Sequence, residues 1–326
     1  MQIFDMAHTV EQLMKYLDEI LEHYGFETAA EAETWLKEQS ENRTLEEFLD
    51  QCATPSLRLL FAWQKAENEL DPEKALELYQ QAIDYAEGHL RVALEAARND
   101  PSTWTESKAQ PYLCSLFGRA AMQEMLGQME EAEKSYRQIF EADPLDSLGA
   151  IEKLFAIALI DGRLVDAREW LERLHDDQRV ALDYQRALLR FLEAADQAEQ
   201  EYQRTGDLDF AAAWHDEKAD AMLQRAILRN PFVPHLILHP RALEAPCPEE
   251  AEPGSPAEAL QIMYATAHLW LSDLLVISWL MTHTEQSDLR NHRFGLEWQE
   301  MLDLIGGQPS EEEIQEYVRR LQELDL

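Results

Sequence analysis

The chain has 326 residues, 46% of them hydrophobic, so it can bury a sizeable core and is not disordered by composition. Its 28 basic and 64 acidic residues give a formal charge of −36, which repels phosphate backbones and anionic lipid surfaces. We therefore expect no direct binding of nucleic acid or of a membrane. The charge favours basic partners, although an acidic surface that only maintains solubility would look the same.

Composition predicts an all-α fold. Good helix formers (Ala, Leu, Glu and Gln) dominate, only 11 Gly and 13 Pro interrupt them, and no sustained alternation of β-branched and aromatic residues indicates strands. The three cysteines, Cys52, Cys114 and Cys247, are odd in number and far apart, which fits neither a disulfide framework nor a zinc site. The acidic, amphipathic start resembles no secretory signal, so we expect a cytoplasmic protein.

Residues 1–54 are expected to form an N-terminal segment of short helices. Thr9 can cap a helix that ends at about Tyr24, where Gly25 supplies the left-handed stop. Thr28 can open a second helix that continues through Trp35. A third helix would begin at the capping box formed by Thr44 and Glu47.

Residues 55–232 are expected to be helical repeats. The stretch "GQMEEAEKSYRQIFEADP" (127–144) places Gly127 at a turn, Ala132 where two helices approach, Tyr136 between them and Pro144 at the stop. A helix–turn–helix repeat of about 34 residues requires such offsets. Similar stretches are "DPEKALELYQQAI" (71–83), "DGRLVDAREWLERL" (161–174) and "EKADAMLQRAILRNP" (217–231), the last preceded by a first helix at 180–195. We predict a tetratricopeptide-like α-solenoid with flanking helical segments; a generic helical bundle is the alternative.

Residues 233–326 are expected to form a proline-rich crossing segment and C-terminal helices. The prolines after Pro231 predict an extended segment whose apolar side chains cover a surface. Ser255 or Pro256 would then open one long apolar helix to about His283. Its stretch 260–281 could span a bilayer by length, but the polar Asp273 within it favours a helix buried in a soluble core. Ser310 would cap a last helix.

Two pairs of motifs carry a family resemblance. They are "AQPYLCSLFGRAA" leading into "GQMEEAEKSYRQIFEADPLDSLGA", and "RNPFVPHLIL" followed by "GSPAEALQIMYATAHLW". Their order resembles the bacterial tetratricopeptide-containing relatives of the suppression-of-tumorigenicity-seven family, over roughly residues 55 to 270. The chain differs where the family has a Gly- and Arg-containing run and this sequence reads "LILHPRALEAP". The resemblance implies an α-solenoid without a known catalytic apparatus.

The residues do not predict an enzyme. No phosphate-binding glycine loop or nucleophile elbow is present, and the carboxylates are too numerous for any pair to be informative. His235 and His239 with nearby Cys247 lack a further ligand pair, so we expect no metal and no cofactor. His268 and Asp273 could form a polar pair in a pocket, but a core histidine satisfied by a neighbour is the simpler interpretation. Trp104 lies in a loop and anchors it or recognises a partner.

We expect a protein–protein interaction scaffold or adaptor. First helices of stacked pairs line a concave groove that holds an extended or helical peptide. A carboxylate clamp would need Lys, Arg and Asn, so we expect a basic or amphipathic segment of another protein. Alternatives are a self-associating protein or homodimer whose groove holds its own C-terminal section, and an acidic mimic of nucleic acid. The candidate groove residues are Gln64, Glu67, Phe117, Ala121, Glu124, Glu152, Ala156 and Leu159.

Overall fold

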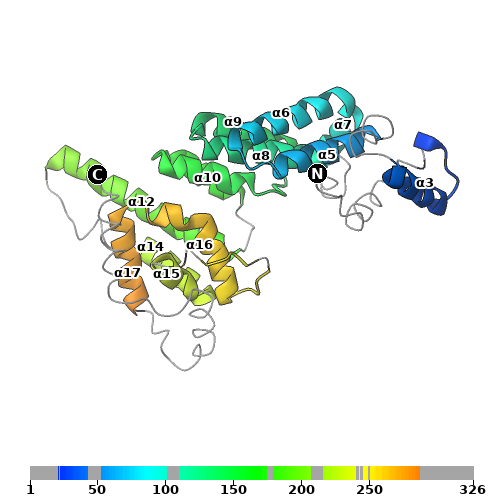
Figure 1. Ribbon diagram of the computed structural model, residues 1–326. Helices are drawn as coiled ribbons and strands as arrows, with labels where there is room; N and C mark the ends of the chain where they lie inside the picture. Colours follow the sequence, from blue (N-terminus) through cyan, green and yellow to red (C-terminus); the bar gives the residue numbers. More distant parts are fainter. Residues whose placement is uncertain are drawn as a thin grey trace. The chain divides into compact units, whose positions relative to one another are not determined.

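A computed structural model describes residues 21, 23–42, 53–100, 110–174, 179–206, 216–239, 242, 245–248 and 250–286. Every regular element within these ranges is a helix, which confirms the all-α class (Figure 1). The chain divides into two compact units, Met1–Leu154 and Phe155–Leu326, and the boundary falls inside a helix. The predicted divisions after residues 54 and 232 stay predictions.

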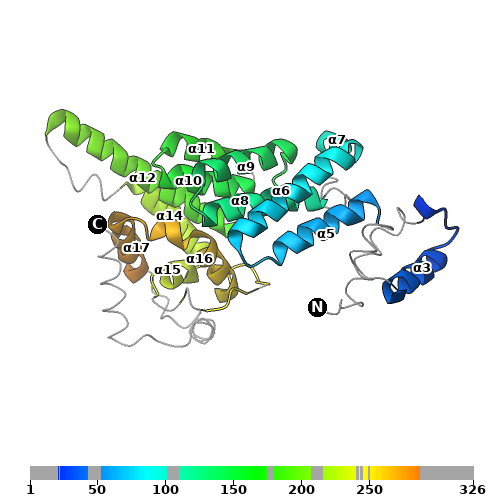
Figure 2. The ribbon, with the colours of Figure 1, turned by 45° about the horizontal axis from the view of Figure 1, so that its top comes forward.

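The first unit contains a group of helices packed around α6 and α8. Helix α6 packs against α5 and α8, and α8 also packs against α5 and α9 (Figures 1 and 2). Repetition through the whole predicted array stays a prediction. The helices of this unit are α3 (Ala29–Asn42), α5 (Pro55–Glu67), α6 (Pro72–His89), α7 (Arg91–Asn99), α8 (Gln110–Met125) and α9 (Met129–Ala142), with α10 (Ala150–Ile160) across the boundary.

Local sequence determines where these helices begin. Thr54 caps α5 through a hydrogen bond from the Leu57 N–H, and Asp71 caps α6 through bonds from the N–H groups of Glu73 and Lys74. Proline follows each cap. An N–H at this first helical position has no acceptor within the helix, so proline loses no hydrogen bond there. The Thr28 hydroxyl accepts the Glu31 N–H at 3.3 Å, which confirms the predicted helix start there, although α3 continues to Asn42. The predicted caps Thr9 and Thr44 lie outside the described residues.

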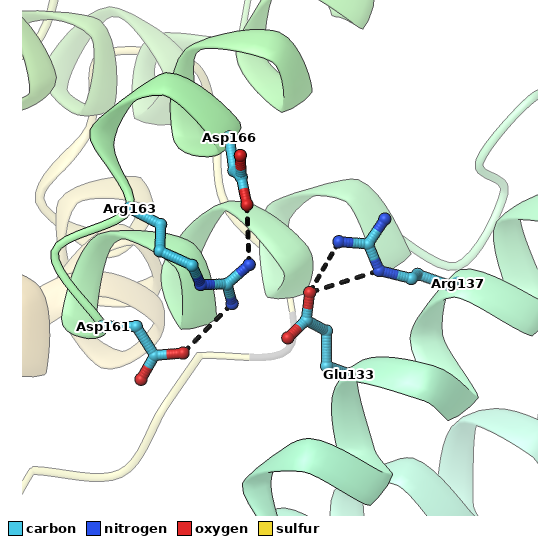
Figure 3. A network of polar contacts seen from close by, with 5 residues as sticks. All are labelled: Glu133, Arg137, Asp161, Arg163 and Asp166. Atoms are coloured by element: carbon cyan, nitrogen blue, oxygen red, sulfur yellow. Dashed lines mark hydrogen bonds and ion pairs between the residues drawn. The ribbon is translucent and has the colours of Figure 1, made fainter.

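Two glycines make the turns predicted for them. Gly127 and Gly162 have φ of 71° and 70°, a left-handed conformation that glycine adopts without strain. Beside the second turn, the Arg163 guanidinium donates to Asp166 at 2.8 Å and to Asp161 at 3.0 Å (Figure 3). These bonds tie the first turn of α11 to the end of α10.

The second unit is built around a long helix. α12 (Val180–Thr205) continues ten residues beyond the predicted end at Ala195, until Gly206 caps it with φ of 73°. Its final turns are largely exposed and project past the other helices of the unit, supported by side-chain pairs within the helix (Figure 2). The remaining helices are α11 (Leu164–Arg173), α14 (Glu217–Arg229), α15 (Phe232–Ile237), α16 (Pro256–Trp270) and α17 (Leu274–Gln286).

The prediction of an extended segment directly after Pro231 is wrong. Residues Phe232–Ile237 form the short helix α15, with Pro231 as its N-cap. Pro234 falls in the first turn, where a helix tolerates proline because the N–H there has no partner within the helix. The apolar side chains of α15 are buried and pack against α16.

The prediction of one continuous apolar helix to about His283 is also wrong. α16 ends at Trp270 and α17 begins at Leu274, with Ser272 and Asp273 exposed in the break. The Asp273 carboxylate accepts the Leu275 N–H at 2.7 Å, so this side chain opens a new helix instead of lying inside a long one. Ser255 caps α16 as predicted, through a 3.1 Å bond from the Glu258 N–H.

The apolar stretch is covered within its own unit. Trp270 and Trp279 stack 6.3 Å apart, and Trp279 stacks on Phe191 of α12 at 4.2 Å. Both tryptophans are almost completely buried. Among the described residues, no helix has the length and hydropathy that a membrane crossing requires.

Candidate functional site

Two of the predicted groove glutamates are fixed by tyrosines on the next helix. The Tyr79 hydroxyl of α6 donates to Glu67 Oε2 of α5 at 2.9 Å. The Tyr136 hydroxyl of α9 donates to Glu124 Oε2 of α8, also at 2.9 Å and across the same 12 residues of sequence. We call these contacts the two tyrosine–glutamate pairs. Each orients a carboxylate near the end of the first helix of its pair.

The tyrosines of both pairs are buried and their carboxylate partners are not. Tyr79 is 3% exposed and Tyr136 is fully buried, whereas Glu67 is exposed and Glu124 half-buried. Burial, together with the adjacent carboxylate, raises the pKa of each phenol well above its ordinary value. Both tyrosines therefore remain neutral hydrogen-bond donors over the physiological pH range.

The Tyr79 ring is held against α8 by a glycine. A Cβ atom built on Gly118 would lie 2.3 Å from Cζ of Tyr79, a distance that a real side chain does not adopt. Cys114 lies one turn earlier in α8, and burial, with the nearby Glu67 charge, raises the pKa of its thiol to about 11. The Glu67 carboxylate is thus placed at a contact of α5, α6 and α8.

The Tyr136–Glu124 pair has two further neighbours, and one of them is the predicted groove residue Phe117. Lys153 of α10 approaches Glu124 Oε2 to 3.0 Å, so this carboxylate is shared between a phenol and an ammonium group. Phe117 packs edge-on against Tyr136 with ring centroids 5.5 Å apart. Phe117 and Glu124 thus both contact Tyr136, and the predicted groove itself stays a prediction.

The other predicted groove residues are placed less favourably. Gln64 is half-buried on α5, one turn before Glu67, and Glu152 is half-buried on α10. Ala156 and Leu159 belong to the second unit, and both are buried in its core. The candidate face of the first unit is consequently limited to Gln64, Glu67, Phe117, Ala121, Glu124 and Glu152.

The sequence predicted the glutamates of the candidate face, but the tyrosine hydroxyls that bind them were not predicted. The signal was a glutamate twelve residues before the tyrosine in both "ENELDPEKALELY" and "EMLGQMEEAEKSY". Tyrosine was assigned only the role of filling space between helices. Its hydroxyl, once buried, also has to find a hydrogen-bond partner.

The prediction of a core histidine at position 268, and the alternative of a polar pair with Asp273 in a pocket, are both wrong. Both side chains are exposed, His268 in the last turn of α16 and Asp273 in the break before α17. A different histidine is buried. His283 Nε2 lies 2.9 Å from Asp220 Oδ1, which also accepts the Trp279 indole N–H at 2.8 Å.

His283 Nδ1 has a neighbour of its own: the Gln224 amide nitrogen lies 3.0 Å away. These contacts join α14 to α17 inside the second unit, and we interpret them as structural.

Three arginines of the second unit line a cavity of about 310 Å³ between α11, α12 and α14. They are Arg168, Arg186 and Arg190. Arg168 pairs with Glu193 at 2.5 Å, Arg190 forms a two-pronged contact with Asp216, and Arg186 donates to the Leu174 carbonyl at 2.7 Å. Each guanidinium is thus already bound to an acceptor of the chain. The charges of Arg168 and Arg190 are balanced by these carboxylates, and Arg186 also lies 3.5 Å from Asp183.

The histidine and cysteine residues considered for a metal are dispersed. His235 lies in α15, His239 follows its end, and Cys247 is exposed. Across the part of the chain that the structure describes, no three His, Cys, Asp or Glu side chains converge as a metal ion would require. Trp104 lies outside the described residues.

The motifs that carried the family resemblance contact one another. The buried Asn230 of "RNPFVP" donates from Nδ2 to the Ser255 carbonyl at 3.0 Å and to Glu258 Oε2 at 2.9 Å, both in "GSPAEAL". Its own carbonyl accepts the Tyr184 hydroxyl at 2.7 Å. The two motifs therefore hold α12, α14 and α16 together, a structural task that is independent of any ligand.

Comparison with known proteins gives no match: no protein-family model, no curated protein and no solved structure is significantly similar to this chain.

Proposed function

We propose that the protein is a non-catalytic interaction scaffold that binds a basic or amphipathic segment of another protein on the first unit. The observation that carries this proposal is the pair of tyrosine–glutamate contacts. They hold Glu67 and Glu124 by the same kind of hydrogen bond near the ends of α5 and α8. Carboxylates whose orientation is fixed before binding lose less conformational entropy when a basic segment arrives.

The internal pairing of basic residues supports the same function. Arginines on several helices are bound by carboxylates of their own helix, as Arg137 is by Glu133 at 2.6 Å (Figure 3) and Arg91 is by Glu95 at 3.0 Å. With 64 acidic residues against 28 basic ones, such pairing leaves a large acidic excess facing outward. That field accelerates the approach of a basic partner.

The alternative of self-association rested on the apolar stretch 260–281. The side chains Leu260, Trp270 and Trp279 of that stretch are buried within the second unit, whereas Tyr264 and Met281 are exposed. The burial of most of the stretch favours the scaffold over this alternative. A nucleic-acid mimic is distinguished by its partner, which would be a DNA-binding protein.

The test is affinity capture from the native cell with charge-neutralised variants. Reversal of Glu67, Glu124 and Glu152 to Lys should abolish recovery of the partner, but it also removes the acceptors of the two tyrosines. The sharper variant is therefore Glu67→Gln with Glu124→Gln, in which each amide oxygen still accepts the phenol. It removes two charges, one of which is paired with Lys153 in the wild type. We expect recovery of a basic partner to fall at least severalfold.

The matched control is Glu77→Gln with Glu141→Gln, which removes the same charge from exposed positions of α6 and α9. We expect this control to capture the partner as the wild type does. Unchanged recovery with the α5 and α8 variant would remove the proposal. An equal loss of partner recovery with both variants would indicate an unspecific effect of net charge instead of a binding site.

A further inference from the structure

The two tyrosine–glutamate pairs differ in one contact. At the second pair, the Lys153 ammonium group of α10 lies 3.0 Å from Glu124 Oε2, the same oxygen that accepts the Tyr136 hydroxyl. At the first pair, Glu67 Oε2 accepts the Tyr79 hydroxyl, and no Lys or Arg within the described ranges pairs with this carboxylate. A cation of the chain itself therefore occupies the second pair and not the first.

The sequence explains this difference between the pairs. Lys153 lies nine residues before Gly162, the glycine that makes the turn after α10. The residue nine positions before Gly127, which makes the corresponding turn after α8, is Gly118. Gly118 has no side chain to extend towards Glu67, and the tyrosine ring of the first pair fills the space beside it. Helix α8 thus supplies no cation where α10 supplies one.

The carboxylate without an internal cation is also the more accessible one. Glu67 is exposed, whereas the side chain of Glu124 is 23% exposed. Lys65 precedes Glu67 by two residues in α5, and helix residues at that spacing do not face each other. A basic group from outside the chain can therefore approach Glu67 directly, but it has to displace Lys153 in order to pair with Glu124.

We infer that the basic segment of the partner places a lysine at Glu67, in the way that Lys153 lies at Glu124. The internal contact shows that a carboxylate bound by a tyrosine hydroxyl still accepts an ammonium group on the same oxygen. Ammonium is a compact charge that needs only one oxygen, whereas a guanidinium binds best to both oxygens of a carboxylate. The inference rests on the proposed function and adds the residue type that the partner presents. Lys153 keeps the second pair closed to the partner.

The experiment measures how single-site variants of the full chain bind a defined lysine peptide. The probe is an acetylated, amidated lysine oligomer with a fluorescent label, and its anisotropy is followed during a titration at physiological ionic strength. Glu67→Gln should weaken binding about threefold, an effect of the size found for exposed ion pairs. Glu124→Gln removes an equal charge but should change the affinity much less, because its carboxylate is already paired with Lys153.

Removal of the internal lysine is the second part of the experiment. Lys153→Met opens Glu124 to the probe and should strengthen binding about threefold, and the gain should disappear when Glu124→Gln is added. The matched control is Lys134→Met at an exposed position of α9, which makes the same change in net charge and should strengthen binding much less. Equal effects of Glu67→Gln and Glu124→Gln, or equal gains in the two lysine variants, overturn the inference.

An arginine oligomer of equal length tests the residue type. It carries the same charge, but the tyrosine hydroxyl already occupies part of the carboxylate that a guanidinium would bind with two parallel hydrogen bonds. We expect Glu67→Gln to weaken its binding less than it weakens binding of the lysine oligomer. An equal or greater loss overturns the assignment to lysine.

This inference and the proposed function fail separately. Loss of partner capture in Glu67→Gln/Glu124→Gln, combined with equal peptide affinities of the two single variants, removes only the lysine site at Glu67. Unchanged capture in the double variant removes the scaffold face, and a peptide affinity that still depends on Glu67 would then identify an ammonium site unrelated to that partner.

Discussion

At the scale of single residues, the first unit depends on close contacts that permit no enlargement. Gly118 lies in the interior of α8, where glycine normally weakens a helix relative to alanine. Here the missing side chain makes room for the buried Tyr79 ring. The Tyr79 phenol can then reach Glu67. The absence of a side chain at position 118 therefore maintains a contact among α5, α6 and α8.

Gly118→Ala should therefore destabilise the first unit, against the usual trend for glycine in a helix. We expect a loss of about 1–3 kcal/mol, because the methyl group has to displace a ring that is held by packing and a hydrogen bond. The free energy of urea unfolding, followed by circular dichroism, measures it. Gly88→Ala in the last turns of α6 is the control, since a Cβ there meets nothing within 4 Å. That control should be neutral or slightly stabilising, and an equally neutral Gly118→Ala would contradict the assigned contact.

At the scale of the element, helix α14 begins where an ion pair and a cap share one side chain. Asp216 Oδ1 accepts the Ala219 N–H at 2.8 Å and the Arg190 Nε–H at 3.0 Å. Burial tends to raise the pKa of Asp216, but the bonds from Arg190 and the helix N–H groups outweigh it and hold that pKa below its ordinary value of 3.8. The same carboxylate thus starts α14 and connects it to α12.

Substitutions at Asp216 should separate these two tasks. Asp216→Asn keeps a capping oxygen and loses the charge, whereas Asp216→Ala loses both, so we expect losses of about 1 and about 2 kcal/mol. A depressed carboxyl pKa stabilises the fold above the ordinary value, and this stabilisation is lost as the pH falls below it. The difference in unfolding free energy between wild type and Asp216→Asn should therefore shrink from pH 6 towards pH 3. A constant difference would show that charge is not involved.

At the scale of the whole molecule, the dominant feature is the charge of −36. Many local ion pairs, such as Arg163 with Asp166, neutralise only neighbouring charges and leave the long-range repulsion among the remaining carboxylates. A large net charge of one sign opposes the compact state. The field that would attract the proposed basic partner therefore also destabilises the free protein.

Added salt should stabilise the unbound chain while it weakens partner binding. We expect the melting temperature to rise by a few degrees between 10 mM and 0.3 M NaCl and then to level off. Screening is nearly complete once the Debye length falls well below about 10 Å. A thermal melt series at fixed pH measures the effect. A steady linear rise would indicate a general solvent effect, and a fall would mean that attractive ion pairs outweigh the repulsion.

The sequence by itself determined the all-α class and most of the local signals at which helices begin and turns form. Capping side chains such as Thr28 and Ser255, and glycines such as Gly127 and Gly162, act on backbone groups within a few residues, so their effect can be predicted without the rest of the fold. The small and aromatic positions, among them Ala132 and Tyr136, were also correctly assigned to buried faces, because helical periodicity alone places them there.

Tertiary structure decided which polar groups meet and where apolar runs break. The partner of a buried imidazole depends on which helices pack together, so the Asp220–His283 contact does not follow from local pattern. The Tyr79–Glu67 contact has a sequence signal in its twelve-residue spacing, but only the packing of α5 against α6 brings the two groups together. The run 260–281 could continue as one helix by propensity. It breaks because the two halves bury more apolar surface by folding back on α12 and α15, while Asp273 starts the second half. Local rules determine which segments form helices and where capped helices begin. The balance of burial and hydrogen bonding across the fold determines where an apolar run breaks and which helices contact one another.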